Sequence, residues 1–271
     1  MTYKNKPPPK KDTPKPQSQP KKDTSGTTIP FYQSDVGSML GKDSNPSLVF
    51  DRFPDFWTRG DYQSTPTLEF LKRIVRLVSE NREIDSMLQH TNERRRRLVS
   101  AMGGRSFCLK TQWRFVTGLG LPHPSEIGFR WNPHLSVPVI PGSSIKGALR
   151  SWMRDFENRP EAADTLLGKD GVGQVTILDA LPSRKPKMEV DIINPHYAEY
   201  YSDPEKAIPG DYYSPIPVFF LATAPETEFL FHIMPVTGYA PSLDDVEREM
   251  RDAFRSIGLG AKGNSGYGRF I

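Results

Sequence analysis

Hydroxyl groups and cations lie close together at one predicted helix start. Ser143 and Ser144 come first, and Lys146, Arg150 and Arg154 follow at four-residue spacing, which places the three cations on one helix face. A helix start has free N–H groups and a partial positive charge, so this stretch is typical of a phosphate-binding site. Either serine is predicted to cap the helix. The alternative is an ordinary amphipathic helix with a solvated basic face.

A glycine-rich loop at 258–268 is the second candidate for phosphate chemistry. It has five glycines in eleven residues. Glycines let a backbone approach a ligand and expose N–H groups to it. The loop lacks the Gly-Lys-Ser/Thr of a nucleotide-binding P-loop, and it joins a predicted helix to a strand, unlike a Rossmann turn. The candidate RNA-contacting residues here are Lys262, Gly263, Asn264, Ser265, Gly266 and Tyr267. The alternative is a flexible turn before the last strand.

Three histidines raise the question of metal binding or acid–base catalysis. His123, His134 and His196 each lie beside prolines in predicted loops, with Glu126 and Asp191 as nearby carboxylates in the sequence. Their spacing matches no helical metal motif. Prolines and aromatic residues around them favour packing that fixes the loops. We therefore expect no metal, no cofactor and no catalytic histidine.

The elements that must position these residues follow from periodicity. Helices are predicted at 143–157, near 161–167, and at 242–257, where Ser242 is the predicted cap and Gly258 ends the helix. Strands are predicted at 106–116, 174–181, 187–193, 217–223, 228–235 and 267–271. The strands 217–223 and 228–235 should form a hairpin, the second with Phe229, Phe231 and Ile233 on one face. This order predicts an α+β fold with a ferredoxin-like, RRM-like core and insertions.

The N-terminal part differs in composition. Residues 1–28 are rich in Pro, Lys, Ser and Thr, which predicts a disordered basic tail. Residues 29–105 form an N-terminal extension that is irregular at first and then helical over 67–102. Residues 106–271 form the predicted main domain.

Charge and cysteine content narrow the class of protein. Residues 1–24 hold seven lysines against two aspartates, and the whole chain has a formal net charge of +4, so the remainder is close to neutral. A nucleic-acid site must then come from local placement of cations. The single cysteine, Cys108, excludes an internal disulfide framework and a cysteine-based zinc cluster. No run has the length of a membrane span, and a cytoplasmic location is expected.

Several motifs together resemble a known family. Gly118-Leu-Gly-Leu-Pro-His-Pro, Glu126-Ile-Gly-Phe-Arg-Trp-Asn-Pro and Val137-Pro-Val-Ile-Pro-Gly-Ser-Ser-Ile-Lys-Gly-Ala-Leu-Arg are similar to the RAMP superfamily of CRISPR proteins. Asp191-Ile-Ile-Asn-Pro-His-Tyr and the glycine loop narrow the resemblance to the family of sixth subunits of type III-B (Cmr) effector complexes. The match spans residues ~106–271, and its specificity lies in the combination of motifs.

The resemblance implies a non-catalytic RNA-binding subunit that holds the 3′ region of a CRISPR guide RNA and its duplex with target RNA. Its implied partners are the guide RNA, the target RNA and other subunits of the Cmr effector complex. In the family, the helix after Pro-Gly-Ser-Ser and the glycine loop lie against guide RNA, and target cleavage belongs to another subunit. The alternative is a metal-independent endoribonuclease that processes guide RNA through His123 or His134, as in some relatives.

Overall fold

The computed structural model describes residues 41, 43–54, 57–58, 61–64, 67–169, 171–194, 200 and 217–271, with the backbone alone at 57–58 and 61–64. The helices are α1 (Pro46–Arg52), α2 (Thr67–Glu80), α3 (Glu83–Ala101), α4 (Gly142–Ser151), α5 (Pro160–Leu167) and α7 (Leu243–Ser256). A π-helix (Trp152–Phe156) continues α4, and a 3₁₀ turn spans Gly263–Ser265. The strands are β1 (Trp57–Thr58), β2 (Asp61–Ser64), β3 (Arg105–Lys110), β4 (Trp131–Asn132), β5 (Val137–Pro138), β6 (Val175–Ile177), β7 (Leu181–Pro182), β8 (Met188–Ile193), β9 (Val218–Thr223) and β10 (Glu228–Pro235).

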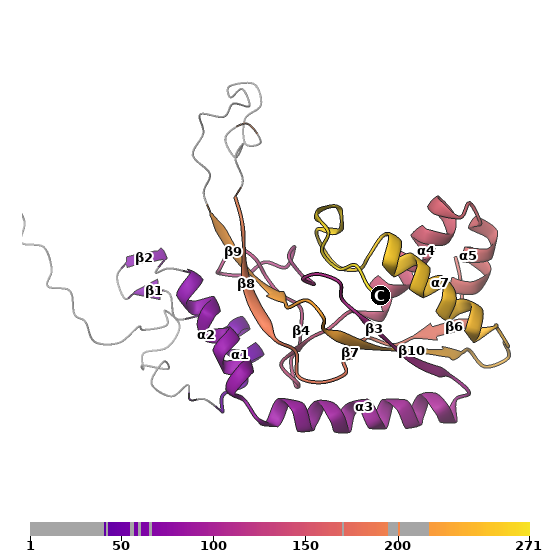
Figure 1. Cartoon of the computed structure of the whole chain (residues 1–271), viewed down its shortest axis with the longest axis horizontal. Helices are drawn as coiled ribbons and strands as arrows, with labels where there is room; N and C mark the ends of the chain where they lie inside the picture. The colour runs from indigo at the N-terminus through magenta and orange to yellow at the C-terminus, as the bar shows by residue number, and fades with distance from the viewer. Residues whose placement is uncertain are drawn as a thin grey trace, which may run out of the picture.

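The main sheet is built around β10. This strand pairs antiparallel with β3 along one edge and with β6 and β7 along the other (Figure 1). The fold is therefore α+β with antiparallel sheets, as the sequence predicts. The ferredoxin-like detail stays a prediction.

The predicted hairpin of 217–223 and 228–235 is wrong. Strand β9 pairs with β8 in a separate two-stranded ribbon, from Met188 opposite Thr223 to Ile193 opposite Val218. The connection 224–227 leads the chain out of that ribbon into the main sheet. Two consecutive apolar strands joined by a short turn are typical of a hairpin, but here each has a partner distant in sequence.

Strand β10 is buried on both faces. Phe229, Phe231 and Ile233 pack against α4 and α7, in an apolar cluster that includes Leu149 and Phe254. On the opposite face, His232 and Met234 are buried as well. Helix α3 lies along that side of the sheet, opposite α4, α5 and α7 (Figure 1). Helices on both faces of the sheet are the reason that the strand is buried from Phe229 to Met234.

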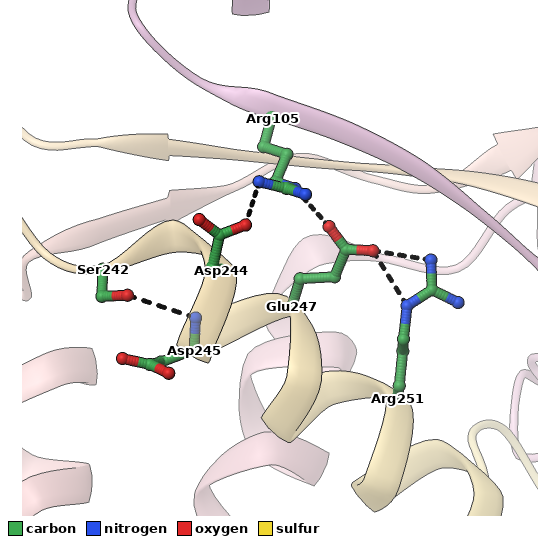
Figure 2. Close-up of polar contacts among 6 residues, drawn as sticks. All are labelled: Arg105, Ser242, Asp244, Asp245, Glu247 and Arg251. Atoms are coloured by element: carbon green, nitrogen blue, oxygen red, sulfur yellow. Dashed lines mark hydrogen bonds and ion pairs between the residues drawn. The ribbon is translucent and has the colours of Figure 1, made fainter.

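Helix α7 begins as its sequence predicts and is fastened to β3 by charge. The Ser242 hydroxyl accepts a hydrogen bond from the backbone N–H of Asp245, which confirms the predicted cap. Figure 2 shows Arg105 on β3 donating to Asp244 and Glu247. The Glu247 carboxylate also accepts from Arg251 over 2.6 Å. These contacts fix the first turns of α7 against the sheet.

The N-terminal extension shares a core with the rest of the chain. Helices α1, α2 and α3 contribute Phe50, Ile74 and Leu88 to an apolar cluster that also contains Trp131 and Val137. The predicted helical stretch 67–102 is confirmed, with a break before α3. At that break the side-chain oxygen of Asn81 accepts the backbone N–H groups of Glu83 and Ile84.

Two further predictions of regular structure need correction. The predicted closing strand 267–271 is not a regular strand: it forms an isolated bridge between Phe270 and Thr111, with further backbone hydrogen bonds to the segment 110–114. The predicted helix 143–157 changes at Ser151 into the π-helix, where the N–H of Glu157 donates to the carbonyl of Trp152 over 3.0 Å. The predicted tail 1–28 and most of the loop 194–216 lie outside the described residues.

Candidate nucleic-acid interface

The start of α4 is capped by an aspartate, and the predicted serine cap is wrong. The backbone N–H of Gly142 donates to Oδ1 of Asp179 over 2.8 Å, and neither serine side chain caps the helix. Asp179 precedes β7, so this cap is a tertiary contact. Ser143 and Ser144 are both exposed, and their hydroxyls are left on the surface at the helix start.

The predicted basic stripe on α4 divides into two parts. Arg150 donates to Asp164 of α5 over 3.1 Å and to the carbonyl of Gly168 over 2.8 Å. Arg154 also lies 3.7 Å from Asp164. Lys146 makes no ion pair or side-chain hydrogen bond within the described part of the chain. Both arginines thus have a carboxylate partner in the protein, although Arg154 is exposed, whereas Lys146 is available to a ligand.

The glycine loop is ordered by its own backbone and by two side-chain contacts. Lys262 and Gly266 take left-handed conformations on either side of the 3₁₀ turn. The Tyr267 hydroxyl donates to Asp191 over 2.6 Å, and burial together with this carboxylate raises the tyrosine pKa to about 12. The Lys262 ammonium lies 6.0 Å from the centre of the Phe220 ring. The loop therefore has a defined shape before any ligand binds.

Some of the loop glycines have a structural reason for being there. At Gly260, which has φ +83°, a Cβ atom would collide with the carbonyl oxygen of Val116. At Gly268, with φ +68°, it would collide with the carbonyl oxygen of Leu259. Gly266 also has positive φ, but its Cβ would meet open space. Close approach of neighbouring backbones explains the first two glycines, and it does not explain the third.

A groove of about 490 Å³ joins the two predicted phosphate-binding stretches. Its walls are the segment 117–121, the first part of α4 and the beginning of the glycine loop, 258–261. The lining residues are Thr117, Gly118, Leu119, Gly120, Leu121, Arg130, Pro141, Ser144, Ala148, Gly258, Leu259, Gly260 and Ala261. Among these described residues there is one arginine and no carboxylate, so the groove favours an anionic ligand.

The predicted site residues are distributed unevenly around this groove. Ser144 lines it, whereas Ser143, Lys146, Arg150, Arg154 and residues 262–267 do not. The sequence reasoning missed Arg130, an exposed arginine that makes no ion pair or side-chain hydrogen bond within the described residues. It also missed the wall 117–121, although the two glycines of that segment belong to a quoted family motif. These glycines lie next to α4 only in the tertiary structure, so the spacing of residues in the sequence does not predict this contact.

A larger hollow of about 690 Å³ lies elsewhere, between α3 and the segment 183–185. Arg82, Arg96 and Arg184 line it, and so do Asp85 and Glu228. Lys185 lines it as well, so four cations face two carboxylates there, whereas Arg130 in the groove has no carboxylate among its described lining neighbours. This hollow supplies a matched surface for control substitutions.

Of the histidine candidates, His123 is packed and hydrogen-bonded within the protein. Nε2 of His123 donates to the carbonyl of Phe50 over 2.8 Å, and its Nδ1 accepts from the N–H of Ser125 over 3.1 Å. Its ring stacks on Phe50 at 4.0 Å, and burial lowers its pKa. His134 is exposed, and His196 lies outside the described residues. Within the described ranges, no group of three or more His, Cys, Asp or Glu side chains is placed to hold a metal ion.

Comparison with known proteins gives the class of protein. A profile described as the RAMP superfamily matches residues 108–271, which contain most of the main sheet, α4, α7 and the groove. The chain belongs to the RAMP superfamily. This confirms the family suggested by the motifs.

Two matching relatives are more specific than the superfamily profile. The chain is 31% identical over 227 residues to the CRISPR system Cmr subunit Cmr6 of Pyrococcus furiosus, covering 60% of this chain and 66% of that protein. It is 29% identical over 150 residues to the CRISPR system CMR subunit Cmr6 of Saccharolobus solfataricus, covering 54% of this chain and 48% of that protein. The resemblance to the sixth Cmr subunit is thereby confirmed, although the chain spans less than two thirds of either relative's length.

A solved structure supports the same likeness. A chain of the cryo-EM structure of the Type III-B Cmr-beta bound to cognate target RNA matches with a TM-score of 0.56 and 25% identity. The match covers 75% of this chain and 71% of that chain.

In the described part of the protein, no helix is both long enough and apolar enough to cross a membrane.

Proposed function

We propose that this protein is an RNA-binding subunit of a type III-B CRISPR effector complex, and that guide RNA lies in the groove between α4 and the glycine loop. The observation that carries the proposal is the groove itself. It brings together the exposed Ser144 hydroxyl, the unpaired guanidinium of Arg130 and two glycine-rich walls, with no carboxylate among the described lining residues. The relatives' identity as Cmr6 subunits supports the assembly.

The chemistry of the groove suits an RNA of arbitrary sequence. Guide RNAs differ in sequence, so a protein that holds them must contact the sugar–phosphate backbone and read shape. A guanidinium binds phosphate through paired donors, and hydroxyl groups donate to phosphate oxygens. Short apolar and glycine residues in the walls leave room for the backbone of the ligand. Pairing of the bound guide with target RNA would then be left to the bases.

We also propose that the subunit is non-catalytic. Both ring nitrogens of His123 are occupied by neighbouring groups, and neither His123 nor His134 lines the groove. The purified protein should therefore leave guide precursor and target RNA intact. Cleavage by the wild-type protein that disappears in His123→Ala would instead establish the endoribonuclease alternative.

The RNA site is tested by the salt dependence of binding. Arg130→Ala should weaken binding of a guide-length RNA and reduce the slope of log K against log salt by about one phosphate contact. Arg184→Ala is the matched control, because it removes the same charge from the other hollow. Equal effects of the two substitutions, or none from Arg130→Ala, would place the RNA outside the groove.

Membership in the complex needs a separate measurement. Affinity purification of the tagged protein from its native host should recover other Cmr subunits together with RNA of defined length. Recovery of the protein alone, under conditions that preserve other effector complexes, would contradict that part of the proposal.

A further inference from the structure

One exposed aromatic side chain lies close to the groove. Trp113 follows β3 in a bend, and 48% of it is exposed to solvent. By contrast, Trp131 is 7% exposed and belongs to the core. Tryptophan is seldom left so accessible on a folded surface unless its ring contacts a ligand or a partner.

The Trp113 ring is already held in place on one face. The guanidinium carbon of Arg114 lies 5.1 Å from the ring centre, over the face of the indole. Arg114 is fixed in turn, because its Nε donates to Glu189 over 2.9 Å and its Nη1 lies 3.3 Å from Asp191. Two carboxylates therefore hold the arginine, and the arginine orients the indole. The open face of the ring is pre-organised for a second flat partner.

Backbone contacts place Trp113 beside the glycine loop and near the groove. The N–H of Gln112 donates to the carbonyl of Arg269 over 2.9 Å, and the carbonyl of Arg114 accepts from the N–H of Gly268 over 3.0 Å. Four residues further on, Thr117 lines the groove. Four residues span at most about 14 Å, so the indole lies within a few nucleotides of RNA bound there.

We infer that Trp113 is a base-stacking platform for the RNA strand that leaves the groove. The inference rests on the proposed function and adds a contact to bases. Stacking on an indole suits every base, because each has a π face, so this contact keeps the sequence tolerance that a guide-binding protein needs. Arg114 covers the other face, which gives an arginine–indole–base arrangement. The stacked base restrains the strand at a point where phosphate contacts alone would let it slide.

The first test compares Trp113→Ala with Trp113→Phe in the full chain. Stacking predicts that Trp113→Ala weakens equilibrium binding of a guide-length RNA about tenfold, and that Trp113→Phe retains most of the affinity. The slope against log salt should stay unchanged in both, since no phosphate contact is lost. RNA should also quench the fluorescence of the wild-type protein more than that of Trp113→Phe. Both variants should unfold at the wild-type temperature, because the ring is exposed.

The second test places an abasic nucleotide at each position of the RNA in turn. One abasic position should weaken binding to the wild-type protein and have no further effect on Trp113→Ala. Equal losses for both proteins at every position would overturn the inference.

The outcomes separate the inference from the proposed function. If Arg130→Ala weakens binding and Trp113→Ala does not, the stacking inference fails and the groove stands. If neither variant affects binding, the proposed RNA site fails, and the inference fails with it. Unchanged RNA affinity combined with loss of Trp113→Ala from the purified complex would identify a protein contact and overturn the inference.

Discussion

Arg150 of α4 and Asp164 of α5 form an ion pair over 3.1 Å that ties the two helices together. The same arginine donates to the carbonyl of Gly168 over 2.8 Å, just beyond the end of α5. The last carbonyls of a helix lack partners within the helix and carry partial negative charge, so a cation is stabilising there. The structure thus gives Arg150 a role in fastening α5, whereas the sequence placed it among the phosphate contacts.

Arg150→Ala should therefore lower stability more than it lowers RNA affinity. Loss of charge-assisted hydrogen bonds that are partly shielded from solvent should reduce the free energy of unfolding by about 2 kcal/mol. Urea denaturation measures this effect, and the salt dependence of RNA binding should keep its wild-type slope. Lys146→Ala is the control, and it should leave stability unchanged. If Arg150→Ala has wild-type stability and a reduced salt dependence of RNA binding, Arg150 contacts RNA and this prediction is wrong.

Two glycines of the loop should respond differently to alanine. Gly268→Ala puts a Cβ atom onto the carbonyl oxygen of Leu259, in a left-handed conformation, so we expect a loss of about 3 kcal/mol or more. Gly266→Ala meets open space and bears only the cost of positive φ, about 1 kcal/mol. Urea denaturation of both variants checks the difference. If Gly266→Ala folds normally and still weakens RNA binding, the predicted contact between RNA and the backbone at Gly266 gains support. Unchanged RNA binding would contradict that predicted contact.

Local pattern was sufficient for most of the helices, but the short α1 lies in a stretch that was predicted to be irregular. Periodicity located α2, α3, α5 and α7, and the Ser242 cap marked the start of α7 correctly. These signals depend only on residues three or four positions apart, so they can be recognised in the sequence without knowledge of the tertiary structure. The cap of α4 failed because its acceptor, Asp179, is distant in the sequence, and local serines looked equally suitable.

Strand pairing and the groove could not be predicted in the same way. Apolar strands β9 and β10 carry no information about which strand each will join, so proximity in the chain suggested a hairpin that does not form. Likewise, a basic stripe does not show whether Asp164 will face it. Arg130 became a site residue only when folding brought its wall against α4 and the glycine loop.

Glu247 should contribute more to the attachment of α7 than Asp244 does, although both accept from Arg105 (Figure 2). The Glu247 side chain is 13% exposed and also accepts from Arg251, whereas that of Asp244 is 76% exposed. We expect Glu247→Ala to cost about 2 kcal/mol, because it removes the acceptor that Arg105 and Arg251 share and leaves Arg251 without a carboxylate partner. Asp244→Ala should cost less than about 1 kcal/mol, as exposed ion pairs usually do. Equal losses in urea denaturation would contradict this ranking.

His232 should make the protein less stable as the pH falls. It is fully buried on β10, where Nδ1 lies 2.8 Å from the Ser106 hydroxyl and Nε2 has no hydrogen-bond partner within the described residues. Burial, together with the nearby cations Arg95 and Arg96 of α3, lowers its pKa to about 4. An unfolded histidine has a pKa of about 6.5, so the unfolded state takes up the proton first.

The stability lost through His232 should therefore appear between pH 6.5 and pH 4 and amount to roughly 3 kcal/mol. Urea denaturation of the wild-type protein and His232→Asn across this range measures it. The variant should be less stable at pH 7.5, since a buried imidazole is replaced, but its stability should fall less steeply towards pH 4.5. His134→Asn, at an exposed position, should follow the wild-type curve. Parallel curves for the wild-type protein and His232→Asn would show that His232 does not titrate in this window, and that the acid sensitivity arises from other groups.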